Sequence, residues 1–187
     1  MFRLTFSENE KAAPPGAGRR EIGNSFTFPY LGNDFRSYLA SNFVSKFPDS
    51  LNEILIDGVD ASWLTIDHAV LATLYLYLSE ICENKERSAL LRRTGLRFSD
   101  KGDIGRKVAK HYRNVVPRTP EESASWVAIR DYAIEVITFE AFKHCPERMR
   151  VLQNTGDAQL YYTYVIGRKR LYVRAKHLES ARRVANT

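Results

Sequence analysis

The segment that most constrains the fold is residues 63–78, WLTIDHAVLATLYLYL. Its second part is almost uninterrupted apolar sequence, and its total length favours a buried helix over a strand. Thr65 is a suitable N-cap, which would place Asp67 and His68 in the first turn. The sequence therefore predicts a core helix whose entrance carries one carboxylate and one imidazole.

The composition is that of an ordinary globular protein. A chain of 187 residues with 44% hydrophobic content is long enough to bury the core of one domain. No apolar run reaches about 18 residues without a polar interruption, so no membrane contact is predicted. Residues 1–15 lack the apolar segment of a secretory signal, and Cys82 and Cys145 are interpreted as reduced thiols. We therefore expect an intracellular, cytoplasmic protein.

The pattern along the chain predicts a mainly α-helical fold with a few short strands. Residues 8–24 combine Pro, Gly, Ala and charge, so we expect residues 1–24 to form a flexible arm before one globular domain over residues 25–187. Besides the helix described above, the patterns predict a strand over 52–58, helices over 84–95 (with Gly95 as the stop), 103–116, 120–145, 147–156 and 176–184, and two Tyr-rich strands within 160–175.

Familiar catalytic motifs are missing. The chain has no Gly-rich phosphate loop and no HExxH, and its four His and two Cys are not spaced as metal ligands. We therefore predict neither a metal nor a cofactor, and no local signature supports a Cys–His nucleophile pair. Carboxylates remain, and Asp67 has two interpretations: it offsets the helix dipole of a core helix, or it is catalytic.

Five short motifs occur in an order that resembles the NADAR/YbiA-like family. They are SNF at 41–43, IDG at 56–58, WLTIDH at 63–68, Trp126 with Arg130, and FKHCPERMRVLQNTGDAQL at 142–160. The resemblance covers roughly residues 35 to 161, and the WLTIDH and PERMRVLQNTGDAQL blocks keep the family spacing without a gap.

The resemblance implies an N-glycosidase fold and activity. Family members are associated with ribosylamine phosphates and with removal of ADP-ribose from modified guanine. The family's catalytic Glu corresponds here to Asp67, which would stabilise positive charge on the sugar. A helix N-terminus would keep this carboxylate ionised. The substrate-binding residues that the resemblance implies are Asn42, Trp63, His68, Arg118, Trp126 and Arg130.

Two departures from the family pattern support a second hypothesis. The polar QAxKF that follows the family's His is replaced by VLATLYL, and the family's C-terminal WGxG segment is missing. The alternative is a catalytically degenerate domain that serves as a structural or assembly module, for instance in a viral particle, with the N-terminal arm as its contact.

The third hypothesis is a nucleic-acid-binding protein. The net charge is +6, which favours anionic partners, and GRKRLYVRAKHLESARRV at 167–184 mixes basic residues with tyrosines. A solvated charged face over a packed hairpin explains the same pattern. We expect at most a weak, sequence-independent contact with nucleic acid through this basic C-terminus.

Overall fold

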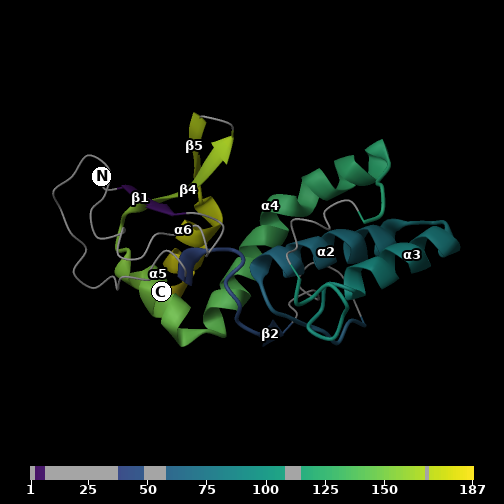
Figure 1. The fold of residues 1–187 in the computed structure, drawn as a ribbon, viewed down its shortest axis with the longest axis horizontal. Helices are drawn as coiled ribbons and strands as arrows, with labels where there is room; N and C mark the ends of the chain where they lie inside the picture. The colour runs from purple at the N-terminus through teal and green to yellow at the C-terminus, as the bar shows by residue number, and fades with distance from the viewer. Residues whose placement is uncertain (1–2, 7–37, 49–57, 108–114, 167–168) are drawn as a thin grey trace. The chain divides into compact units, whose positions relative to one another are not determined.

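The computed structural model describes residues 3–6, 38–48, 58–107, 115–166 and 169–187. These residues form a mainly helical protein with short strands, as predicted (Figure 1). The helices are α2 (Ile66–Ile81), α3 (Lys85–Leu96), α4 (Pro120–Lys143), α5 (Pro146–Asn154) and α6 (Lys176–Ala185). The strands are β1 (Arg3–Phe6), β2 (Phe47–Pro48), β3 (Ser62–Trp63), β4 (Gln159–Ile166) and β5 (Lys169–Arg174).

Contacts divide the chain into two compact units, whereas the sequence predicted one domain over residues 25–187. One unit comprises Val44–His144, and the other combines Met1–Phe43 with Cys145–Thr187. Within the described residues, no helix is both long enough and apolar enough to cross a membrane.

The Val44–His144 unit is built around α2, which packs against α3 and α4. Most of the apolar part of α2 is buried, including Tyr75, Leu76 and Leu78 at 0% exposure. The predicted N-cap of α2 is confirmed, since the Thr65 side chain accepts the backbone N–H of His68 at 3.1 Å. At α4 the predicted start is also confirmed, because Thr119 caps the helix and Pro120 occupies its first position.

Gly95 does not stop α3, contrary to the sequence prediction. The helix continues to Leu96, and Gly95 lies inside it against α2. A Cβ atom added at Gly95 would lie 2.7 Å from Leu76 Cγ and 3.0 Å from the Ala72 carbonyl oxygen. The glycine is therefore explained by the close approach of two helices and not by a C-terminal turn.

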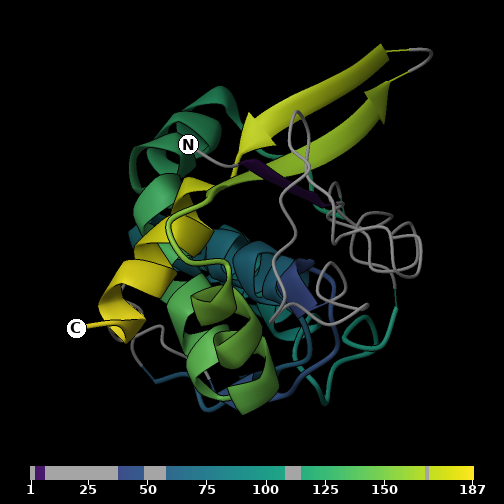
Figure 2. The ribbon, with the colours of Figure 1, turned by 90° about the vertical axis from the view of Figure 1, so that its left-hand side faces the viewer.

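The second unit contains a three-stranded sheet in the order β1-β4-β5 (Figure 2). Strand β1 is parallel to β4, with Arg3 opposite Gln159, and β5 is antiparallel to β4, with Arg174 opposite Tyr161. Helix α6 contacts both β4 and α5. Burial of Leu4, Leu160 and other apolar side chains on this sheet forms the core of the unit.

Three predicted segments differ from the structure or lie outside it. Residues 3–6 form β1 and bury Leu4, so the expected arm begins with a paired strand; residues 7–24 lie outside the described residues. Residues 103–107 form turns and not the start of a helix, and residues 108–114 are outside the described part. The predicted strand at 52–57 is outside it too.

Candidate functional site

The segment before α2 is held by a small sheet. Phe47 of β2 lies opposite Trp63 of β3 in an antiparallel pair. Both rings are only 1% exposed, so Trp63 is a core side chain in this structure. The substrate contact that the resemblance implied for Trp63 needs an exposed ring face. The structure gives Trp63 a packing role instead.

Asp67 and His68 follow in the first turn of α2, as the sequence predicted. Asp67 is partly exposed, while His68 is 3% exposed. The positive end of the helix dipole therefore lies beside a carboxylate that solvent can reach. This placement is compatible with both interpretations of Asp67, as a helix-capping charge and as a catalytic group.

His68 connects α2 to the loop of residues 97–107. Its Nε2 lies 2.8 Å from the carbonyl oxygen of Lys107, and because a carbonyl only accepts, Nε2 carries the proton. The Nδ1 atom is then an acceptor, and it is buried without a hydrogen-bond partner. Burial lowers the pKa of His68, partly offset by the bond to the Lys107 carbonyl. His68 is thus a neutral, buried side chain in this structure.

The loop that meets His68 is tightly folded. A Cβ atom at Gly102 or Gly105 would collide with backbone, since the nearest carbonyl oxygens lie 2.2 Å and 1.8 Å away. The loop is tied to the β2–β3 sheet, because the Asp100 N–H donates to the Ser62 carbonyl at 2.8 Å and its carboxylate meets Lys46 Nζ at 2.7 Å. The loop that hydrogen-bonds to His68 in the first turn of α2 therefore has a tightly constrained backbone conformation.

The two predicted side chains on α4 have different environments. Trp126 is 6% exposed and belongs to the core, whereas Arg130 is exposed and forms an ion pair with Asp131 at 3.0 Å. The Arg130 guanidinium is accessible to a phosphate. The Trp126 ring is not accessible for stacking in this arrangement.

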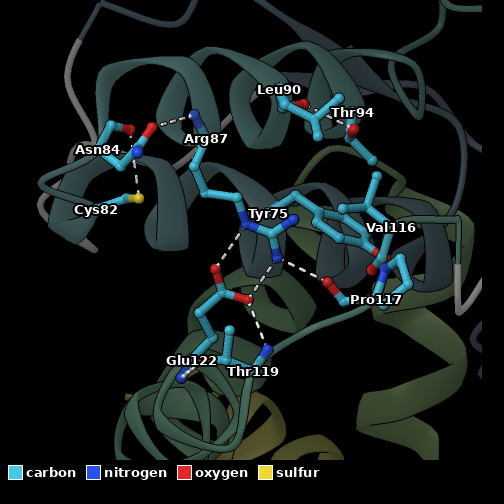
Figure 3. Close-up of polar contacts among 10 residues, drawn as sticks. All are labelled: Tyr75, Cys82, Asn84, Arg87, Leu90, Thr94, Val116, Pro117, Thr119 and Glu122. Carbon is cyan, nitrogen blue, oxygen red and sulfur yellow. Dashed lines mark hydrogen bonds and ion pairs between the residues drawn. The ribbon is translucent and has the colours of Figure 1, made fainter.

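A polar junction joins α3 to the start of α4 (Figure 3). Arg87 of α3 donates through Nε and Nη2 to the carboxylate of Glu122 at 3.0 and 2.8 Å, and also to the carbonyl of Pro117 at 2.6 Å. Arg118, which is exposed, follows Pro117 directly. Arg118 therefore lies immediately before Thr119, the N-cap of α4.

Tyr75 of α2 also contacts the segment before α4. Its hydroxyl donates to the carbonyl of Val116 at 3.3 Å. Tyr75 follows Asp67 by about two turns, roughly 12 Å along the helix axis. The sequence predicted Thr119 as the N-cap and Glu122 as a favourable charge near the helix dipole, and the structure shows that the two also form a capping box. No sequence pattern indicated that Glu122 has a partner on α3.

Replacing Glu122 by Gln should destabilise the protein by about 2 kcal/mol, because it removes a charge-assisted, two-point hydrogen bond to Arg87. The pKa of Glu122 is lowered mainly by its hydrogen bond with Arg87. This contribution is therefore present above the ordinary Glu pKa and is lost as pH falls through the folded-state pKa.

The matched control is Glu121→Gln, which changes the neighbouring exposed carboxylate of the same helix turn. Urea denaturation near neutral pH should give a clearly lower midpoint for the Glu122 variant than for the Glu121 variant. Equal midpoints would show that the junction contributes nothing beyond the helix dipole.

Asn42 belongs to the other unit, where Arg148 of α5 holds its segment. Arg148 is 0% exposed and donates to the carbonyls of Tyr38 and Ala40 at 2.8 and 2.9 Å. Its guanidinium carbon also lies 5.1 Å from the centre of the Phe43 ring. Asn42 is partly exposed between these anchored residues. Sequence analysis gave no sign that Arg148 is buried.

Acid should destabilise the protein through His68. Its pKa in the folded chain is below the ordinary value of 6.5, so the unfolded chain binds protons more readily between the two values. The stability that neutral His68 gives is complete above about pH 6.5 and falls as pH decreases toward the folded-state pKa.

Urea midpoints measured at about pH 7.5 and about pH 5.5 should test this. The fall in the urea midpoint between these two pH values should be smaller in His68→Gln than in the wild type. His144→Gln, which removes an exposed histidine of the same unit, should decline like the wild type. If the urea midpoint of His68→Gln falls as much as that of the wild type, His68 is not the cause of the acid destabilisation.

No protein-family model, curated protein or solved structure matches this chain significantly.

Proposed function

We propose that this protein is an N-glycosidase that hydrolyses the bond between a nitrogen and the anomeric carbon of a ribosylated, phosphorylated nucleotide-like substrate, with Asp67 as its catalytic carboxylate. The observation that carries the proposal is the position of Asp67, partly exposed in the first turn of α2 beside a buried His68. The motif resemblance to the NADAR/YbiA-like family supports the same assignment.

The chemistry fits a single carboxylate. Breaking an N-glycosidic bond builds positive charge on the sugar, and a nearby carboxylate stabilises the oxocarbenium-like transition state. His68 is held by the Lys107 carbonyl, and this bond fixes the turn from which Asp67 extends. Arg118 and Arg130 are exposed cations among the predicted ligands of this unit, and either would meet a phosphate. The proposal requires neither a metal nor a cofactor.

The test is hydrolysis by the full chain of an ADP-ribosylated guanine nucleoside and of a ribosylamine phosphate. Released base is quantified by chromatography, with and without a metal chelator. We expect release that is proportional to enzyme and insensitive to the chelator. A folded protein that releases no base from either substrate would count against the proposal.

A second candidate function is a non-catalytic assembly module. The observation that favours it is the burial of both tryptophans, because Trp63 and Trp126 are 1% and 6% exposed and leave no ring face for a base. Inertness toward both substrates, together with a defect in assembly after removal of residues 8–24, would favour this function.

A further inference from the structure

Strand β5 is the outer strand of its sheet, because β4 separates it from β1. All six of its residues pair with β4 on one side, and no described segment pairs with its other side. In antiparallel pairing, alternate backbone N–H and C=O groups point to each side of a strand. The outer side of β5 therefore presents hydrogen-bonding groups to which a further strand can be added.

Three consecutive apolar side chains of β5 are also accessible. Leu171, Tyr172 and Val173 are 45%, 47% and 50% exposed, and consecutive residues of a strand point to opposite faces. Neither face is therefore fully covered at this position. Strand β1 pairs only with residues 159–162 of β4, so the hairpin extends beyond it (Figure 2). Three adjacent exposed apolar side chains on an edge strand favour association.

The positive charges near the ends of β5 indicate which kind of partner would bind this strand. A second copy of this chain, paired antiparallel about the centre of the strand, would place Lys169 opposite Arg174 at both ends. Arg174 is ion-paired with Glu179, so the charge of Lys169 and the net charge of +6 are what oppose self-association. Exposed Lys176 adds positive charge after the strand. An acidic partner fits these charges.

Nucleic acid fits less well, because part of the basic C-terminus is already engaged within the unit. Arg174 forms an ion pair with Glu179 at 2.9 Å. Arg182 is only 7% exposed and donates to the Thr155 hydroxyl and, at 2.9 Å, to the Ala158 carbonyl. Of the arginines expected to contact phosphates, these two are therefore neutralised or buried.

We propose that β5 binds an extended peptide segment of a partner protein, apolar in its centre and acidic at its ends, as an added strand of the sheet. Main-chain hydrogen bonds along the outer side of β5 would supply affinity. Leu171, Tyr172 and Val173 would contact the apolar centre, and Lys169 and Lys176 would attract the carboxylates.

The test uses the full chain and a fluorescein-labelled peptide of about seven residues, in which Val and Thr alternate between a Glu at each end. Fluorescence anisotropy should show saturable binding. Val173→Glu should weaken it at least about tenfold. The matched control is Val184→Glu on α6, since Val184 is 54% exposed and Val173 is 50% exposed; its affinity should change less than about twofold.

Circular dichroism establishes that each variant is folded, and Tyr172→Ala, which removes an exposed side chain on the opposite face, serves as a second weakening variant. Equal binding of a peptide with Lys in place of Glu would overturn the assignment of an acidic partner. Equal weakening by Val173→Glu and Val184→Glu would overturn the assignment to β5. Saturable binding of a single-stranded oligonucleotide in place of the peptide would assign the surface to nucleic acid and overturn the proposal.

Discussion

Asp67→Asn should abolish the release of free base from an ADP-ribosylated or ribosylamine phosphate substrate. Amide and carboxylate have nearly the same shape, so the substitution removes charge without removing volume. Loss of a preorganised electrostatic group costs roughly 3–4 kcal/mol in the transition state, which is about a 100- to 1,000-fold loss of rate. The measurement is initial rate at saturating and at low substrate concentration, so that kcat and KM are separated.

The melting temperature should stay within a few degrees. Asp67 interacts with the helix dipole in the first turn of α2, and this is worth only about 0.3–1 kcal/mol. Asp60→Asn is the matched control, because Asp60 is an exposed carboxylate of the same unit and should retain full activity. Unchanged turnover in Asp67→Asn would remove Asp67 from the mechanism and leave it a helix-capping charge.

Arg148→Met should produce the largest loss of stability among single substitutions in its unit. Methionine fills much of the same volume, but it leaves the carbonyls of Tyr38 and Ala40 without their donor, in a place where Arg148 is fully buried. Each unsatisfied buried group costs about 1–3 kcal/mol, so we expect a loss of about 3 kcal/mol. For a chain of this size the melting temperature should fall by about 6–12 °C.

Arg150→Met separates the hydrogen bonds from the general effect of removing a cation. Arg150 is exposed and lies two positions further along α5. Thermal denaturation followed by circular dichroism should show little change for this variant. Equal melting temperatures for the two variants would show that the hydrogen bonds from Arg148 to residues 38–40 make no measurable contribution to stability.

Features with a local cause were predictable from the sequence. Thr65 precedes an apolar run, and Thr119-Pro120 precedes two acidic residues, so the starts of α2 and α4 follow from capping chemistry alone. The same holds for the antiparallel strands β4 and β5, which are rich in β-branched and aromatic residues. The position of Asp67 in a first turn was predictable for this reason.

Features with a distant cause were not predictable. Gly95 has the local signature of a helix stop, but the reason for it is Leu76 on another helix. Residues 103–107 contain helix-forming residues, yet the backbone approach at Gly105 folds them into turns. The partner of His68 is a backbone carbonyl 39 positions away, and the partners of Arg148 lie more than 100 positions away. No local pattern encodes such contacts.

The parallel pairing of β1 with β4 has a consequence for the order of folding during synthesis. Arg3 lies opposite Gln159, a separation of 156 positions along the chain. At translation rates of about 5–20 residues per second, β1 leaves the ribosome roughly 8–30 s before its partner strand exists. The whole Val44–His144 unit is synthesised during this interval, so this unit can fold first. Strand β1 remains unpaired until β4 has been synthesised.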